Sequence, residues 1–164
     1  MDEGAEVVGA EAVADALRPL YVDLRRFAAV VGPIELDPED LVQEAVVRLL
    51  GSGHWSDVRD LRAYLRRTIV NLASNERRRL GRQRAALDRL PTEVTLIATY
   101  PSDVSELARL DPMTRGLLYL VELEGYTTEE AAMVVGCEPA AARARLSRAR
   151  RRLRVELASE SVDD

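Results

Sequence analysis

The chain has 164 residues, of which 47% are apolar and only 4% aromatic, a composition typical of helical globular proteins and sufficient for two small domains. No apolar run reaches the roughly 18–20 residues of a membrane span, and the N-terminal stretch has no export signal, so we expect no membrane insertion and a cytoplasmic location. One cysteine, Cys137, and one histidine, His54, exclude an internal disulfide and a histidine–cysteine metal cluster. We therefore expect no metal and no cofactor.

The net charge of -5 hides two strongly basic segments. Residues 59–89 hold ten arginines and three acidic residues, and residues 143–154 hold seven arginines and no acidic residue. Every basic residue of the chain is arginine, for which a genomic base-composition bias is one explanation, but such a bias does not explain the clustering. Because guanidinium groups bind phosphates and guanine edges through paired hydrogen bonds, the two clusters indicate contact with nucleic acid.

The first half of the chain predicts three helices. Apolar residues recur at helical spacing over 20–31, and a glycine–proline pair ends that helix. An aspartate followed by proline is typical of a capped helix start, which predicts a second helix over 37–50. A glycine-rich break at 51–53 follows, and the third helix is expected to begin within 56–60.

The third helix has two distinct faces. Four apolar residues recur on one face and are expected to be buried: Leu61, Leu65, Ile69 and Leu72. Four polar residues fall in a line on the opposite face and are expected to point outward: Arg67, Asn71, Ser74 and Arg78.

A second helical unit follows a linker. Residues 86–108 show mixed periodicity and several turn formers, so we expect them to connect two units. Asp111-Pro112 opens a helical segment that Gly125 ends, and its predicted core residues are Leu117, Leu118, Leu120 and Val121. Together the two units predict an all-α fold.

A helix-turn-helix is predicted from Tyr126 to Arg154. Thr127 or Thr128 caps a short helix, Gly136 supplies the tight turn, and a proline begins the next helix. The buried stripe of that helix is expected to be Ala142, Leu146, Ala149, Leu153 and Leu157. Its outer face is expected to be Arg143, Ala144, Ser147, Arg148 and Arg151. A basic outer face that follows a short helix and a glycine turn is the docking geometry of a DNA recognition helix.

The basic helix and the cysteine in the turn each admit a second interpretation. An ordinary solvated helix would also carry charge, but seven arginines without an acidic neighbour in the sequence would repel one another unless a polyanion were the partner. Cys137 is interpreted as a small apolar residue that fills the turn rather than as a reactive thiol.

These residues resemble a known family. Three segments of the second half are similar to the fourth-domain signature of extracytoplasmic-function (group IV, sigma-70 family) RNA polymerase sigma factors. They are the lead-in LDPMTR at 110–115, TTEEAAMVVG at 127–136 and RARLSRAR at 143–150. In the first half, DPEDLVQE at 37–44 resembles the family's polymerase-binding helix, and 61–73 resembles its promoter-melting helix. The resemblance covers about residues 15–155.

The resemblance implies a domain organisation and a function. An N-terminal tail at 1–14 precedes a σ2-like domain at 15–85, and the linker at 86–108 leads to a σ4-like helix-turn-helix domain at 109–157 and a C-terminal tail at 158–164. The chain would bind core RNA polymerase and direct promoter-specific transcription initiation, without enzymatic activity of its own. Implied partners are the clamp helices of the largest polymerase subunit, the beta-subunit flap, promoter DNA and an anti-sigma factor.

The resemblance also implies three groups of site residues. The core-polymerase-binding residues would be Asp40, Leu41, Gln43 and Glu44. The minus-ten element would be bound by Trp55, Arg67, Asn71, Ser74 and Arg78, with loop 54–60 as the pocket of a flipped base, although Trp55 is equally well interpreted as a core anchor. The minus-thirty-five element would be bound by Arg115, Arg143, Ala144, Ser147 and Arg148.

The chain departs from the family pattern at a few positions. Met113 replaces a basic or polar residue, and alanines at 140–142 replace a small-polar start of the recognition helix, which leaves fewer hydrogen-bonding groups for base readout. Tyr64 stands where tryptophan is common. The linker stretch 94–98 is more apolar than an exposed tether, which suits a polymerase channel or a regulator.

Two other classes of function stay open. A stand-alone helix-turn-helix regulator would bind duplex DNA without polymerase, and an interaction protein would use a sigma-like first domain only to occupy polymerase or another partner. The acidic helix around 40–44 favours the sigma factor, because a simple repressor does not need it. An enzyme is disfavoured, since the sequence has no Ser/His/Asp set and no phosphate-binding glycine loop.

Overall fold

The computed structural model describes residues 12–53, 55–87, 107 and 109–160, and these ranges contain helices joined by short turns and loops, with no strand. After a short helical segment at 12–17, the elements in chain order are α2 (Tyr21–Val31), α3 (Pro38–Gly51), the 3-10 turn η1 (Trp55–Asp57), α4 (Leu61–Leu87), α6 (Pro112–Leu118), the π-helix η2 (Tyr119–Leu123), α7 (Thr128–Val135) and α8 (Pro139–Glu160). The predicted all-α fold is confirmed.

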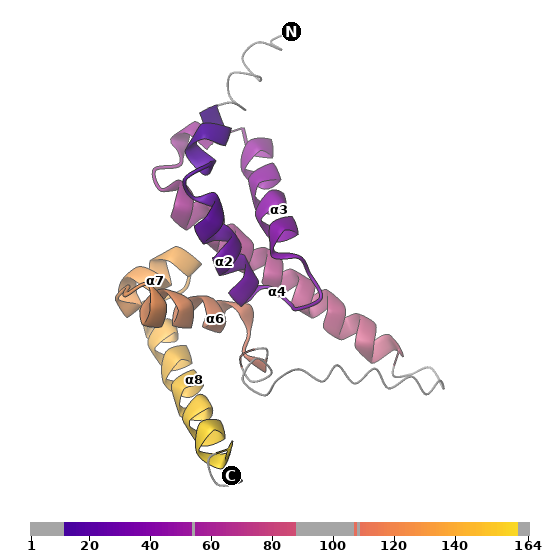
Figure 1. Cartoon of the computed structure of the whole chain (residues 1–164), viewed down its shortest axis with the longest axis vertical. Helices are drawn as coiled ribbons and strands as arrows, with labels where there is room; N and C mark the ends of the chain where they lie inside the picture. Colours follow the sequence, from indigo (N-terminus) through magenta and orange to yellow (C-terminus); the bar gives the residue numbers. More distant parts are fainter. Residues whose placement is uncertain (1–11, 54, 88–106, 108, 161–164) are drawn as a thin grey trace.

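Helices α2, α3 and α4 pack against one another and form the first unit (Figure 1). Its interior is aliphatic, with one phenylalanine at the centre; the buried residues include Leu24, Phe27, Ala28, Val31, Leu41, Val42, Ala45, Leu49, Leu65 and Ile69. Three of the four apolar residues predicted on the third helix are buried, while Leu61 is half-buried. Burial of these side chains holds the unit together, at about 1.5–3 kcal/mol for each large aliphatic or aromatic side chain.

Local signals set the helix boundaries of this unit. Asp37 caps α3, since its carboxylate accepts a hydrogen bond of 2.8 Å from the Glu39 backbone, and proline occupies the first turn as the sequence predicts. The carboxylate of Asp60 accepts a hydrogen bond of 2.9 Å from the Ala63 amide and starts α4. Helix α4 runs to Leu87, two residues into the segment expected to be a linker.

Helices α6, α7 and α8 with η2 form the second unit. Asp111 caps α6 through the Thr114 amide, and Gly125 adopts a φ of +74° between η2 and α7. Thr127 caps α7 in a reciprocal capping box with Glu130. Gly136 ends α7 in the left-handed region, with φ 76°, where a residue with a Cβ would be strained. The predicted helix-turn-helix is therefore present, with Thr127 as the cap.

The two units pack against each other, which the sequence did not predict. Helix α6 lies against α2 and α4, and α7 lies against α4 (Figure 1). Gly116 permits this close approach: a Cβ at this position would lie 3.3 Å from Phe27 and 3.4 Å from Val70 in the first unit. Buried side chains of both units consequently form one continuous hydrophobic cluster.

Candidate nucleic-acid interface

The outer face of α8 carries the polar residues that the sequence places there. Arg143, Ala144, Ser147, Arg148 and Arg151 are all exposed, whereas Ala142, Leu146 and Ala149 are buried against the rest of the second unit. Because residues three and four positions apart share one side of a helix, this pattern produces a continuous basic surface along α8. Its shape and charge suit a DNA groove.

Acidic residues from neighbouring helices pair with several α8 arginines. Arg143 donates to Glu129 of α7 at 2.6 Å, Arg145 to Asp111 at 3.1 Å, and Arg150 to Glu122 of η2 at 2.8 Å. These acidic partners are 14 to 34 residues away in sequence, so the absence of acidic neighbours within 143–154 does not leave the arginines unpaired. These ion pairs orient the guanidinium groups, but an ion pair that is exposed to solvent contributes little to the stability of the fold.

The polar line of α4 lies at the junction of the two units. Arg67, Asn71 and Arg78 are exposed and Ser74 is half-buried. The Arg67 guanidinium occupies the space next to Gly136 where a Cβ would otherwise be. The line therefore points outward from the first unit, as predicted, and its Arg67 end lies against the turn of the helix-turn-helix.

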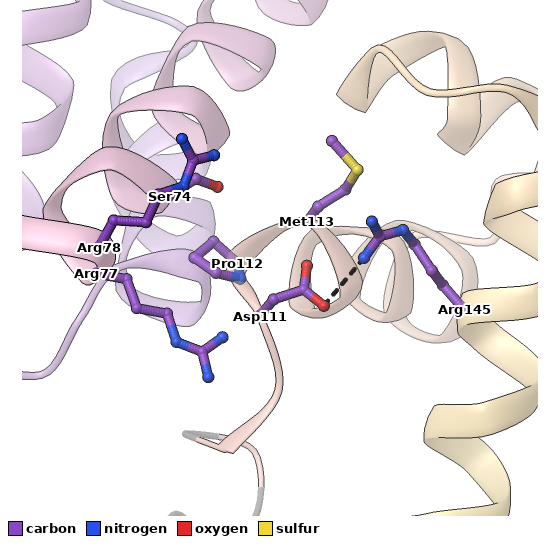
Figure 2. Close-up of a pocket in the computed structure, with 7 residues that line it drawn as sticks. All are labelled: Ser74, Arg77, Arg78, Asp111, Pro112, Met113 and Arg145. Atoms are coloured by element: carbon purple, nitrogen blue, oxygen red, sulfur yellow. Dashed lines mark hydrogen bonds and ion pairs between the residues drawn. The ribbon is translucent and has the colours of Figure 1, made fainter. Parts of the chain in front are cut away.

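A cavity of about 550 Å³ lies between α4 and the second unit (Figure 2). Its lining comes from both units: Ser74, Arg77, Arg78, Asp111, Pro112, Met113 and Arg145. On the side of the cavity that the second unit forms, Arg145 pairs with Asp111. On the α4 side, Arg77 donates a hydrogen bond to the Arg109 carbonyl at 3.0 Å. Burial raises the pKa of Asp111, but hydrogen bonds from Thr114 and the charge of Arg145 outweigh burial and hold that pKa below its ordinary value. The cavity is thus a basic hollow with a single carboxylate.

One face of α3 presents most of the predicted polymerase-binding residues. Asp40, Gln43 and Glu44 are exposed, and Glu44 pairs with Arg48 at 2.9 Å. Leu41 is only 4% exposed and belongs to the core, so the prediction that it contacts a partner is corrected to a structural role. Val47, which is 60% exposed and one turn beyond Gln43, extends the face and was missed by the sequence argument.

Trp55 is the one predicted minus-ten residue that lies partly in the core. Trp55 is half-buried in η1 and packs against the core of the first unit, which favours the anchoring interpretation for at least part of its ring. His54 and the apolar linker stretch 94–98 lie outside the described residues.

Arg115 differs from its predicted position on the DNA-binding surface. It is only 7% exposed, and its Nη1 donates to the Gly32 carbonyl in the first unit at 3.0 Å. Burial, together with the nearby positive charge of Arg77, lowers the pKa of Arg115 to about 10. In this arrangement Arg115 joins the two units and is not available to a phosphate.

Arg66 is the residue that sequence reasoning missed most clearly. Its side chain is fully buried, donates two hydrogen bonds of 2.8 and 2.6 Å to Glu124, and lies 5.3 Å from the Phe27 ring centre. The spacing of residues along α4 could have indicated its burial. Arg66 precedes the buried residues Val70 and Ala73 by four and seven positions and therefore lies on the same face of the helix. Arg66 is one of the ten arginines of the basic segment 59–89, but it does not contribute to a nucleic-acid surface in this structure.

Other chemistry is limited in the described part of the chain. No group of three or more potential metal ligands occurs there. Cys137 is half-buried against the core, and burial raises its thiol pKa, as expected for a small residue that fills the turn. None of the described helices combines the length and apolar character needed to cross a bilayer.

Comparison with known proteins gives consistent matches over both units. Residues 17–83 match the Sigma-70 region 2 family, and residues 105–153 match the Sigma-70 region 4 family. The RNA polymerase sigma-E factor of Streptomyces avermitilis is 31% identical over 150 residues, covering 85% of this chain and 82% of that protein. The sigma-E factor of Streptomyces coelicolor is 31% identical with the same coverage, and that of Streptomyces antibioticus is 30% identical over 80% of this chain and 76% of its own.

Solved structures show the same fold. The sigma factor RpoE, in its complex with the anti-sigma factor NepR from Bartonella quintana, superposes with a TM-score of 0.66 at 24% identity, covering 90% of this chain and 97% of its own. CnrH, in its complex with the cytosolic domain of CnrY, superposes with a TM-score of 0.61 at 26% identity, covering 92% and 90%. The chain belongs to the extracytoplasmic-function group of sigma-70 family RNA polymerase sigma factors, which direct promoter-specific transcription initiation.

Proposed function

We propose that three surfaces divide the work of initiation: the exposed face of α3 binds core polymerase, the outer face of α8 binds the minus-thirty-five element, and the polar line of α4 binds the minus-ten element. The observation that carries this assignment is that one chain presents both an acidic α3 face and a basic α8 face. A DNA-binding regulator that acts alone needs only the second. The protein then acts in the cytoplasm by binding rather than by catalysis.

The α8 surface supports binding to duplex DNA. Arg143, Ser147 and Arg148 are exposed within its first three turns, where a recognition helix reaches base edges. Arginine hydrogen-bonds guanine in the major groove and neutralises phosphates, so both readout and affinity follow from the same face. The alanine-rich start of α8, with Ala144 also on the outer face, limits readout there to apolar contacts, such as those with thymine methyl groups.

The α4 line suits single-stranded DNA. Arg67 and Arg78 supply positive charge, while Asn71 and Ser74 supply hydrogen-bonding groups between them. Such a mixture allows a displaced strand to be held by its backbone and its bases together. Trp55, the first residue of η1 in the segment that precedes α4, supplies a ring surface on which a base would stack.

The α3 face suits a basic helical partner. Asp40 and Glu44 provide negative charge, and Val47 adds an apolar contact on the same side. We assign this face to the clamp helices of the largest polymerase subunit, and a surface of the second unit to the beta-subunit flap. An anti-sigma factor is a further proposed partner. The likeness to RpoE, whose structure is a complex with the anti-sigma factor NepR, and to CnrH, whose structure is a complex with the cytosolic domain of CnrY, supports this proposal.

Run-off transcription tests the assignment. Core polymerase with this chain should produce discrete transcripts from fragments of the source genome, and core polymerase alone should not. Asp40→Ala with Glu44→Ala should reduce polymerase binding at least tenfold, whereas Asp15→Ala, which changes an exposed acidic residue of the helical segment 12–17, should not. Binding to duplex DNA without polymerase, combined with the absence of any specific transcript, would support the stand-alone regulator instead.

A further inference from the structure

We infer that the cavity between α4 and the second unit is a binding site for a small molecule that carries a diphosphate group, and that a nucleoside diphosphate is the class of ligand that fits it best. The arginines that line the cavity from two sides carry this inference, together with its volume. The inference goes beyond the proposed function, because neither polymerase nor promoter DNA takes part in it.

Positive charge dominates the wall of the cavity. Arg77 and Arg78 come from α4 on one side, and Arg145 comes from α8 on the other (Figure 2). Asp111 is the only acidic residue of the lining, so three arginines and one aspartate give the lining side chains a net charge of +2. Like charges around one volume repel one another, and a bound polyanion replaces that repulsion by attraction.

The guanidinium groups are already oriented and still have donors to offer. Within the described ranges, Arg145 uses its Nη1 for Asp111 and Thr114, at 3.1 and 3.4 Å. Arg77 uses its Nη2 for the Arg109 carbonyl, at 3.0 Å. A guanidinium group has five N–H donors on three nitrogens, so each of these contacts leaves donors for a further acceptor. Arginine binds phosphate oxygens through paired hydrogen bonds, which makes phosphate the matching ligand.

The surroundings of the cavity increase its positive potential. A smaller cavity of about 170 Å³ shares Asp111 and Arg145 with it and is also lined by Arg148 and Arg152. Behind the α4 side, burial and the positive charge of Arg77 together lower the pKa of the guanidinium of α6 that reaches Gly32. Positive charge is therefore concentrated on both sides of the cavity, where an anion would be stabilised.

The size and the apolar part of the wall favour a nucleotide over a lone phosphate. A volume of about 550 Å³ lies within the range of small-molecule sites, and a single phosphate ion would fill only a small part of it. Pro112 and Met113 add apolar surface at the start of α6, and Ser74 adds a hydroxyl group. A base would pack on the methionine or stack on a guanidinium plane while the arginines hold the phosphates.

A DNA strand is the other phosphate-bearing candidate, since Ser74 and Arg78 also belong to the α4 line. The cavity favours a small molecule because its lining comes from α4, α6 and α8, whereas a strand that follows the α4 line would need only α4. Arg77 and Arg145, which lie outside the proposed DNA-binding surfaces, therefore distinguish the two ligands.

Isothermal titration calorimetry of the full-length chain tests the site. The probes are ADP, GDP, AMP, pyrophosphate and orthophosphate at constant ionic strength. ADP or GDP should bind at one site, and AMP and orthophosphate should bind at least about tenfold more weakly, because each lacks charge-assisted hydrogen bonds that a second phosphate makes. Pyrophosphate distinguishes the two sources of the diphosphate group: weaker binding than ADP supports a nucleotide, and equal binding supports recognition of the diphosphate alone.

Variants of single arginines locate the binding. Arg77→Gln and Arg145→Gln should each weaken ADP binding by about tenfold. The matched controls are Arg84→Gln on α4 and Arg150→Gln on α8, both exposed and outside the cavity, and these should leave ADP binding unchanged. Circular dichroism checks the helices of every variant. Arg77→Gln keeps the pair between Asp111 and Arg145, so it tests the site even if Arg145→Gln disturbs the fold.

Three results would overturn the inference. The first is that no probe with a diphosphate group binds, and the second is that the control variants weaken binding as much as the cavity variants. The third is that single-stranded DNA binds in a manner that depends on Arg77 and Arg145 while ADP does not bind, which would assign the cavity to DNA. Calorimetry needs no polymerase, so ADP binding without any specific run-off transcript would support the site while contradicting the proposed function.

Discussion

Arg66 and Glu124, 58 residues apart in sequence, form an ion pair through two hydrogen bonds and thereby join helix α4 to the end of η2. Removal of one partner from such a buried pair generally costs about 3–5 kcal/mol, while replacement of both by apolar groups costs much less. We expect Glu124→Ala to lower the free energy of unfolding by about 3 kcal/mol, and Arg66→Met with Glu124→Ala to lower it by less than the sum of the single changes. Urea denaturation of the four proteins measures this coupling. Additive losses would mean that the pair has no net energetic role.

The packing of Gly116 gives a second prediction. A Cβ at this position would lie 3.3 Å from Phe27, 3.4 Å from Val70 and 3.5 Å from Val135, so Gly116→Val forces side chains apart. We expect a loss of about 1–3 kcal/mol in the free energy of unfolding, as for other overpacked sites. Gly81→Val is the control, because nothing lies within 4 Å of its Cβ. A comparable loss in both variants, measured by thermal denaturation, would show that close packing is not the cause.

Local structure could be predicted from the sequence wherever a short-range signal determines it. The Asp37 and Thr127 caps and the Gly136 turn depend on residues within three or four positions of one another, and all three are present. The burial of Leu65 and Ile69 follows from helical spacing alone. These signals were sufficient to place the basic face of α8.

The packing of the two units could not be predicted in the same way. It depends on Arg66 with Glu124 and on Arg115 with Gly32, and each pair joins residues more than fifty positions apart. An arginine that is buried by a distant acidic residue has no local signature that separates it from an exposed arginine. For that reason the buried position of Arg115, which the family resemblance places on the DNA surface, and that of Arg66, within the basic segment 59–89, could not be predicted.

The capping box of α7 gives a third prediction. Thr127 and Glu130 satisfy each other's backbone amides, at 3.2 and 2.8 Å. Thr127→Ala should lower the free energy of unfolding of the helix-turn-helix by about 1 kcal/mol, because an amide at the start of α7 loses its acceptor. Thr128→Ala, one position into the helix, should change it much less. Equal effects in chemical denaturation would argue against the reciprocal cap.

The lowered pKa of Asp111 predicts a pH dependence. Its carboxylate accepts from the Thr114 amide and hydroxyl and from Arg145, so the folded protein favours the charged form. This contribution is complete above the ordinary aspartate pKa of about 3.9 and is lost as the pH falls through the lower value of the folded state. Asp111→Asn should therefore lower stability at pH 6 and flatten its decline below about pH 4. Asp15→Asn, at an exposed aspartate, is the control. Parallel stability curves for wild type and Asp111→Asn would contradict the prediction.

The basic face of α8 gives a prediction about DNA rather than stability. Arg143→Ala and Arg148→Ala remove exposed guanidinium groups and should each weaken binding of minus-thirty-five duplex DNA while leaving core polymerase binding intact. If the residue contacts a phosphate, the slope of log affinity against log salt should fall by about 1; if it reads a guanine, the loss should be about 1–3 kcal/mol and specific to one base pair. Arg18→Ala, at an exposed arginine before α2, is the control. Equal loss of DNA and polymerase binding would show that α8 is a structural helix whose charge only keeps it solvated.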